Sequence, residues 1–174
     1  MSPGAFTRAG ALVLVVAAMG ATTSHAQGLV AQQRLSAALA NELVGETVAI
    51  CAKKGYKVAV AVVDLDGVRQ AFLRGDGSPI HSSDNAFYKA YTAASMTLGR
   101  NEGSTREVAE RMAKNPPSTV PPTQLPNITY AVGGVAIKAN GVIIGGIGVS
   151  GAPGGQFDEE CAREALAKIE ARMK

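Results

Sequence analysis

Two residues, Asn140 and Gly141, separate two apolar runs near the C-terminal end of the chain, and this feature limits the available folds most strongly. The runs cover residues 135–138 and 142–149. Asn-Gly between two such runs is the strongest short-range signal of a β-hairpin, because a type I′ turn needs positive φ at both central positions. The sequence therefore predicts a long β-hairpin at the centre of the fold.

Glycines at positions 145, 146 and 148 interrupt the second run. Glycine in a strand gives up packing area and costs backbone entropy, so it indicates that another backbone or a ligand comes close. Gly146, Gly148 and Gly151 also match the G-x-G-x-x-G spacing of dinucleotide-binding proteins. That motif needs a helix that starts at the third glycine, whereas Pro153 follows here and the preceding strand belongs to a hairpin. We therefore reject dinucleotide binding.

The N-terminal residues 1–26 have the pattern of a secretory signal peptide. Arg8 supplies the positive charge, residues 11–18 form a short apolar stretch, and residues 24–26 fit the small-x-small cleavage pattern. The apolar stretch is much shorter than the about 20 residues of a membrane-spanning helix. We expect a periplasmic or secreted protein without a membrane span, whose mature domain comprises residues 27–174.

Charge and length narrow the function classes further. The chain has 17 Lys and Arg against 14 Asp and Glu residues, without a basic run or interleaved aromatic residues. This balance gives no support to nucleic-acid binding. About 150 residues after cleavage is the usual size of one domain.

The remaining patterns predict helices that alternate with β-hairpins. The predicted elements are a helix over 29–54, strands over 58–63 and 68–74, a helix from Ser82 or Ser83 to Gly99, a short helix from Ser104 to Asn115, a short strand over 128–132, the central hairpin, and a helix over 157–173. Consecutive hairpins cannot form a parallel βαβ sheet. The expected fold class is therefore α+β, with one antiparallel sheet flanked by helices in a single domain.

Cys51 and Cys161 lie in the first and the last of these helices. A disulfide between them would close a loop of about 110 residues, for which the chain-entropy model allows about 4–5 kcal/mol. The alternative is that each cysteine is a small buried hydrophobic residue. The sequence leaves both open.

The chain resembles the GlcG/HbpS haem-binding family, whose domain also forms the C-terminal part of PduO proteins. The matching segments are 60–64 (VAVVD) with Gly67, 74–79 (RGDGSP), 89–93 (KAYTA), 133–135, 140–141, 146–151 and 158–161 (DEEC). The resemblance implies a five-stranded antiparallel sheet, symmetric homo-oligomers and, in exported members, binding of haem and sometimes iron. Other members accompany glycolate- or propanediol-utilisation enzymes. An accessory protein or enzyme for a small organic acid or diol is therefore the alternative function.

His81 is the one imidazole that remains after removal of the signal peptide, and imidazole is the commonest haem donor. It precedes a predicted helix, whose dipole disfavours the protonated imidazole. The alternative is a solvated loop histidine. We expect His81 to ligate haem, with a hydroxyl such as Thr119 or Thr123 as the weaker ligand if it does not.

Five further residues are candidates for the same ligand site. Tyr88 and Tyr130 are expected to line a flat apolar ligand, and Lys89 to pair with a haem propionate. The ligand is expected between protomers near Gly133 and Gly134, the proline-rich loop and the second helix.

Glu107 and Glu110 form an E-x-x-E motif on the third predicted helix. Two carboxylates one turn apart can share a cation, which makes them candidate iron ligands. The alternative is that Glu107 completes a capping box with Ser104 and that Glu110 pairs with Lys114.

No catalytic residue is indicated. The run from His81 to Asp84 is better explained as the start of a helix than as a triad. A glycine-rich sheet face and an open hairpin edge both need to be covered, which predicts a homo-oligomer.

Overall fold

The computed structural model describes residues 1, 28–100, 102–114 and 125–173. All its helices and strands belong to the compact unit Gln32–Lys174. Their order is α1 (Ala37–Lys53), β1 (Ala59–Asp64), β2 (Arg69–Arg74), α2 (His81–Ser95), α3 (Thr105–Lys114), β3 (Gly134–Ala139), β4 (Val142–Ser150), α4 (Gly155–Ile169) and the short 3-10 helix η1 (Glu170–Arg172). The α+β class is confirmed, and no helix in the described residues is long and apolar enough to cross a membrane.

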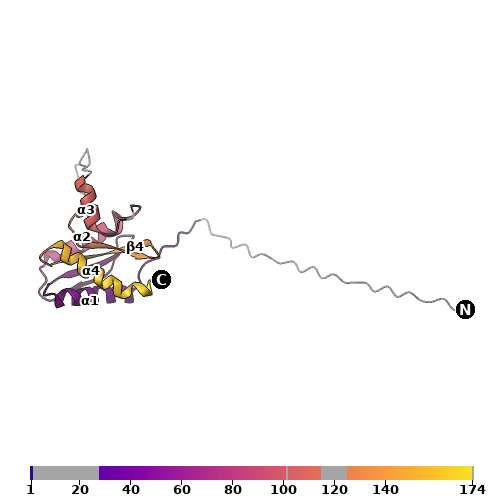
Figure 1. The fold of residues 1–174 in the computed structure, drawn as a ribbon, viewed down its shortest axis with the longest axis horizontal. Helices are drawn as coiled ribbons and strands as arrows, with labels where there is room; N and C mark the ends of the chain where they lie inside the picture. The colour runs from indigo at the N-terminus through magenta and orange to yellow at the C-terminus, as the bar shows by residue number, and fades with distance from the viewer. Residues whose placement is uncertain (2–27, 101, 115–124, 174) are drawn as a thin grey trace. The chain divides into compact units, whose positions relative to one another are not determined.

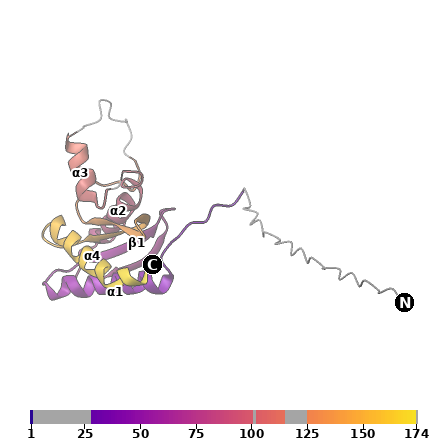
Figure 2. The same ribbon diagram turned by 45° about the vertical axis from the view of Figure 1, so that its right-hand side comes forward.

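The strands form one antiparallel sheet in the order β2-β1-β4-β3, with helices on both faces. Helices α1 and α4 lie side by side on one face, and α2 packs against the other (Figure 1). The same arrangement is visible after a turn about the vertical axis (Figure 2). Large branched residues such as Leu43, Ile137 and Ile147 fill the core under α1 and α4.

The predicted central hairpin is confirmed as β3 and β4. Asn140 and Gly141 have φ of +49° and +79°, as a type I′ turn requires, and Ala139 pairs with Val142 across the turn. On its other side β4 pairs with β1, so the longest strand of the sheet lies in an interior position.

Two glycines of β4, Gly146 and Gly148, allow helix α2 to approach the sheet. A Cβ on Gly148 would lie less than 3.0 Å from the carbonyl oxygen of Ala86 and the amide nitrogen of Ala90, and a Cβ on Gly146 would meet the same helix. The close approach that the sequence predicts is therefore that of a backbone, not of a ligand. The glycine-rich face is covered within the chain, so it does not call for a second protomer.

Close packing also corrects the predicted buried stripe of α2. Helical spacing predicts that Phe87, Tyr91, Ala94 and Leu98 form the apolar stripe of this segment. Leu98 is exposed, however, and both aromatic residues are only half-buried. Small side chains face the sheet instead, because a large ring does not fit between two backbones in such close contact. The apolar residues of this second core are Ala59, Ala61, Val63, Ala86, Ala90 and Ala94.

We expect Gly148→Ala to lower the free energy of unfolding by about 3 kcal/mol, because the new methyl group must displace the backbone of α2. The measurement is urea denaturation followed by circular dichroism. Gly45→Ala is the matched control: nothing lies within 4 Å of its Cβ position in α1, and alanine in a helix is favoured by about 0.5–1 kcal/mol. Similar effects of the two substitutions would contradict this account of the glycines.

Helix α1 begins later than the sequence predicts. The predicted helix over 29–54 starts at Ala37, because Ser36 has an extended backbone and its Oγ accepts a hydrogen bond from the N–H of Leu39 at 3.2 Å. The predicted end is confirmed, since Gly55 has a φ of +82° just after the helix.

Helix α2 begins at His81, without the predicted serine cap. Neither Ser82 nor Ser83 caps the helix: no side chain bonds to its N-terminus, and Ser82 is fully buried. The helix ends at Ser95, before the predicted stop at Gly99.

The predicted fifth strand is wrong. Residues 128–132 belong to no strand, and the sheet has four. Asn127 has a φ of +63°, and the Thr129 N–H donates to Thr92 Oγ1 at 2.9 Å. The Ala131 N–H donates to the Thr129 hydroxyl oxygen, so side chains bind the donors that a strand would use in a ladder.

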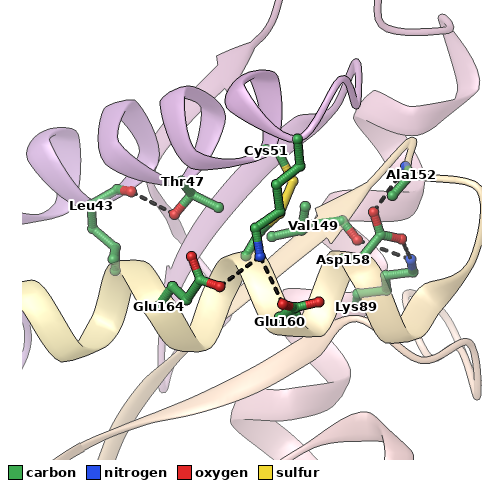
Figure 3. Close-up of a disulfide and its surroundings, with 11 residues drawn as sticks. Leu43, Thr47, Cys51, Lys89, Val149, Ala152, Asp158, Glu160 and Glu164 are labelled. Carbon is green, nitrogen blue, oxygen red and sulfur yellow. Dashed lines mark hydrogen bonds and ion pairs between the residues drawn. A yellow bond between two sulfur atoms is a disulfide. The ribbon is translucent and has the colours of Figure 1, made fainter.

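Cys51 and Cys161 form a disulfide between α1 and α4, with 5.7 Å between their Cα atoms (Figure 3). Beside it, Lys54 binds Glu160 at 2.8 Å and Glu164 at 2.6 Å. These ion pairs are partly exposed and contribute little. The disulfide is therefore the principal link between the two helices outside their apolar contact.

Candidate functional site

A cleft of about 470 Å³ is lined by the start of α2, the segment after β4 and the start of α4. This volume falls in the range of small-molecule sites. The lining is rich in polar groups and glycine. It comprises Pro79, His81, Ser82, Asn85, Lys89, Ala131, Val132, residues 150–156 and Asp158.

A buried ion pair closes the inner end of this lining. Lys89 Nζ donates to Asp158 Oδ2 at 2.8 Å and to the Val149 carbonyl oxygen at 2.9 Å, and the Ala152 N–H donates to Asp158 Oδ1 at 3.0 Å (Figure 3). Lys89 is 3% exposed and Asp158 is 2% exposed. One pair thus joins α2, β4 and α4.

The backbone around this pair leaves it little free space. Gly133 has a φ of +125°, and a Cβ there would lie 2.8 Å from both Lys89 Nζ and Asp158 Cβ. Burial raises the pKa of Asp158 above its ordinary value, and the Lys89 ammonium and the Ala152 N–H oppose this effect. The two charges compensate each other, and the pair serves to hold α2, β4 and α4 together.

Lys89 therefore has a different environment from the one expected. The sequence suggests an exposed helix lysine available to a propionate, whereas two of its donors are bound inside the protein. Sequence reasoning also missed Asp158 as its partner, because the two residues lie 69 positions apart and no local pattern relates them. One sequence signal could have indicated that Lys89 is buried: it lies among alanines at helical spacing, on the face that packs against the sheet.

The exposed face of α2 brings together two of the predicted haem-site residues. His81, Asp84, Tyr88 and Tyr91 follow each other at three- and four-residue steps, and His81 and Tyr88 are exposed. Phe87 lies beside this face, with its ring centroid 5.9 Å from that of Tyr88 and 6.0 Å from that of Tyr91. An imidazole and an aromatic cluster therefore share one helix.

The other predicted haem-site residues have different surroundings. Tyr130 is 48% exposed and does not line the cleft. Gly133 and Gly134 are buried, and the Gly134 N–H donates to the Thr105 hydroxyl oxygen at 3.0 Å, so both glycines serve internal packing. Two further candidates, Thr119 and Thr123, lie outside the described residues.

Glu107 binds groups at the start of α3, but not through the contacts of a capping box, in which its carboxylate would accept the Ser104 N–H. Its carboxylate accepts hydrogen bonds from the Gly103 N–H at 2.9 Å and from the Ser104 hydroxyl at 3.3 Å. Glu110 is exposed. Among the described residues no group of three His, Cys, Asp or Glu side chains is placed to hold a metal ion, so iron binding by Glu107 and Glu110 stays a prediction.

These features define a small α+β domain whose antiparallel sheet carries helices on both faces and whose polar cleft lies at the start of α4. A family model described as "Haem degrading protein HbpS-like" matches residues 35–167. The chain belongs to this HbpS-like family, as its resemblance predicts.

Solved structures agree with this assignment. The crystal structure of HbpS is 32% identical with a TM-score of 0.72, and the match covers 85% of this chain and 99% of that one. HbpS from Streptomyces reticuli with two Glu-to-Asp substitutions is 33% identical with a TM-score of 0.72, covering 87% and 98%. A PduOC:heme complex is 26% identical with a TM-score of 0.63, covering 79% and 96%. No curated protein matches the chain.

Proposed function

We propose that the protein is an exported haem-binding member of the HbpS-like family, which sequesters or senses haem through the exposed face of α2. The observation that carries this proposal is the exposed His81 on the same face as the Tyr88 ring. The two residues are seven positions apart, about two helical turns or 10 Å along the axis.

These residues fit haem in their chemistry. An accessible imidazole is the commonest protein donor to haem iron, and aromatic rings provide the apolar contact that a porphyrin needs. Haem, when bound, supplies an iron centre for electron and oxygen chemistry. The contribution of the chain is to bind and orient it: His81 as donor, with Tyr88 and the rings of Phe87 and Tyr91 beside it.

Export of the protein is part of the proposal. Residues 1–26 carry the charge, apolar stretch and cleavage pattern of a signal peptide. The Cys51–Cys161 disulfide supports the same view, because disulfides persist mainly in oxidising compartments such as the periplasm or the extracellular space.

We also propose that the protein forms a homo-oligomer. The exposed sheet edge supports this proposal, whereas the glycine-rich face does not, because α2 covers it. Strands β2 and β3 are the edges of the sheet, and Phe72 and Leu73 on β2 are about 40% exposed. An edge strand with exposed apolar residues is a surface that a second copy would cover.

We expect His81→Ala to shift the Soret band and change the spin state of the haem complex, because it removes the proposed iron ligand. The measurement is titration of the mature protein with haemin, recorded as absorption spectra. The free energy of unfolding should stay within about 0.5 kcal/mol of the wild type, because His81 is exposed.

Asp76→Ala is the control, since Asp76 is an exposed residue outside the face of α2 that is proposed to bind haem. Its spectra should equal those of the wild type. Identical spectra for wild type and His81→Ala would eliminate His81 as the ligand and direct the search to Tyr88, then Tyr130. Absence of any Soret shift at micromolar haemin would eliminate haem binding itself.

A further inference from the structure

We propose that the cleft at the start of α4 is a carboxylate-binding site. The carboxylate is that of a small organic acid or that of a haem propionate, and the two sources share the same chemistry of recognition. Only the propionate source rests on the proposed haem function.

The first observation is that helix α4 presents an uncapped N-terminus to the cleft. Its N-cap residue, Gly154, has no side chain, and no other side chain bonds to this end of the helix. In the described part of the chain the N–H groups of Gly155 and Gln156 make no hydrogen bond. Such N–H groups carry partial positive charge and bind anions.

The second, independent observation is a buried hydroxyl in the lining of the same cleft. Ser82 is 0% exposed, and its Oγ has no hydrogen-bond partner in the described residues. A buried donor without an acceptor costs about 1–3 kcal/mol. A carboxylate oxygen would supply that acceptor. Near it, Asn85 Nδ2 donates to Ser150 Oγ at 3.0 Å, which leaves the amide a second donor hydrogen.

The charge of the lining favours a carboxylate over a phosphate. Asp158 does not oppose an anion strongly, because Lys89 and the Ala152 N–H bind its two oxygens. Lys89 is the one Lys or Arg in the described lining, and its charge is compensated by Asp158. Helix N–H groups and hydroxyls without a free cation suit a singly charged ligand better than a dianion.

The test is titration of the haem-free mature protein with sodium acetate, followed by the amide NMR signals of Gly155 and Gln156. We expect saturable shifts of both signals with a dissociation constant of about 1 mM or more, and no such shifts with sodium chloride at equal ionic strength. Ser82→Ala should weaken binding about tenfold, the value of one hydrogen bond to a charged group. Linear, non-saturating shifts would overturn the proposal.

Gly154→Asp is the decisive variant, because it places a carboxylate on the N-cap itself. Gly154 has φ −154° and ψ 149°, which any residue adopts, and the three atoms nearest to a Cβ there all belong to the flexible, exposed side chain of Gln156. The variant should fold as the wild type does and lose the acetate shifts. Acetate binding that persists in Gly154→Asp would place the site elsewhere and refute the proposal.

Haemin and haemin dimethyl ester distinguish the two sources of the carboxylate. If the propionate enters the cleft, the wild type binds haemin more tightly than the ester, and Gly154→Asp weakens haemin binding but not ester binding. If the cleft serves a free acid, acetate binds while haemin and the ester bind alike. Because acetate is tested without haem, loss of haem binding and loss of the carboxylate site are separate results.

Discussion

Reduction of the Cys51–Cys161 disulfide is expected to lower the free energy of unfolding by about 4–5 kcal/mol. The bond joins residues 110 positions apart, and the chain-entropy model gives this value for a loop of that length. The loss arises because the reduced unfolded chain has more freedom. The measurement is guanidinium denaturation of the oxidised and the reduced protein, followed by far-UV circular dichroism.

The variant Cys51→Ala/Cys161→Ala serves as the control for the reductant. It should be at least as unstable as the reduced protein, because both sulfur atoms are fully buried and their removal leaves a cavity. Added reductant should not change its stability. A difference of less than about 1 kcal/mol between oxidised and reduced protein would show that the bond does not constrain the unfolded chain as the model requires.

Asp158→Asn is expected to lower the free energy of unfolding by about 3–5 kcal/mol at neutral pH, although it preserves the shape of the side chain. The substitution removes the negative charge and leaves one amide oxygen for two donors, Lys89 Nζ and the Ala152 N–H. The Lys89 ammonium then stays buried without a compensating charge, which is strongly unfavourable. Chemical denaturation of the purified variant measures the loss.

The double variant Lys89→Met/Asp158→Asn tests whether this loss comes from the unpaired charge. Removal of both charges should recover much of the loss, because the cost comes from an unpaired charge and not from a missing attraction. The exposed pair of Lys168 and Glu46, at 2.6 Å, is the control: Glu46→Gln should cost less than about 1 kcal/mol. A double variant as unstable as the sum of the two single variants would contradict this explanation.

The disulfide and the buried pair hold the same part of the molecule. Cys161 and Asp158 lie one turn apart in the first half of α4, the first bound to α1 and the second to α2 (Figure 3). Together they fix the end of α4 that lines the cleft. A helix start held in this way loses little freedom on binding a ligand, which is what a preorganised site requires.

Signals that act over a few residues predicted their part of the fold correctly. Asn140 and Gly141 specified the central hairpin, and Ser104 with Glu107 marked the start of α3, because each signal depends on local backbone geometry or on a neighbour within one turn. The family resemblance was also available from the sequence, since it depends on the order of short segments.

The tertiary structure alone decided what depends on distance between remote segments. The pairing of Cys51 with Cys161 joins positions 110 apart, and that of Lys89 with Asp158 joins positions 69 apart. No local pattern states which partner a buried cysteine or lysine meets.

The same reason accounts for the errors around α2 and the predicted fifth strand. The sequence alone determined that another backbone or a ligand would come close to the glycines of β4. It also determined that an α+β domain with one central hairpin would form. Only the folded chain showed that the close neighbour is α2, so that alanines rather than aromatic rings face the sheet. It also showed that backbone N–H groups within residues 128–132 donate to side-chain hydroxyl oxygens and not to a neighbouring strand. The reason is that a backbone donor pairs with whichever acceptor the rest of the fold brings near.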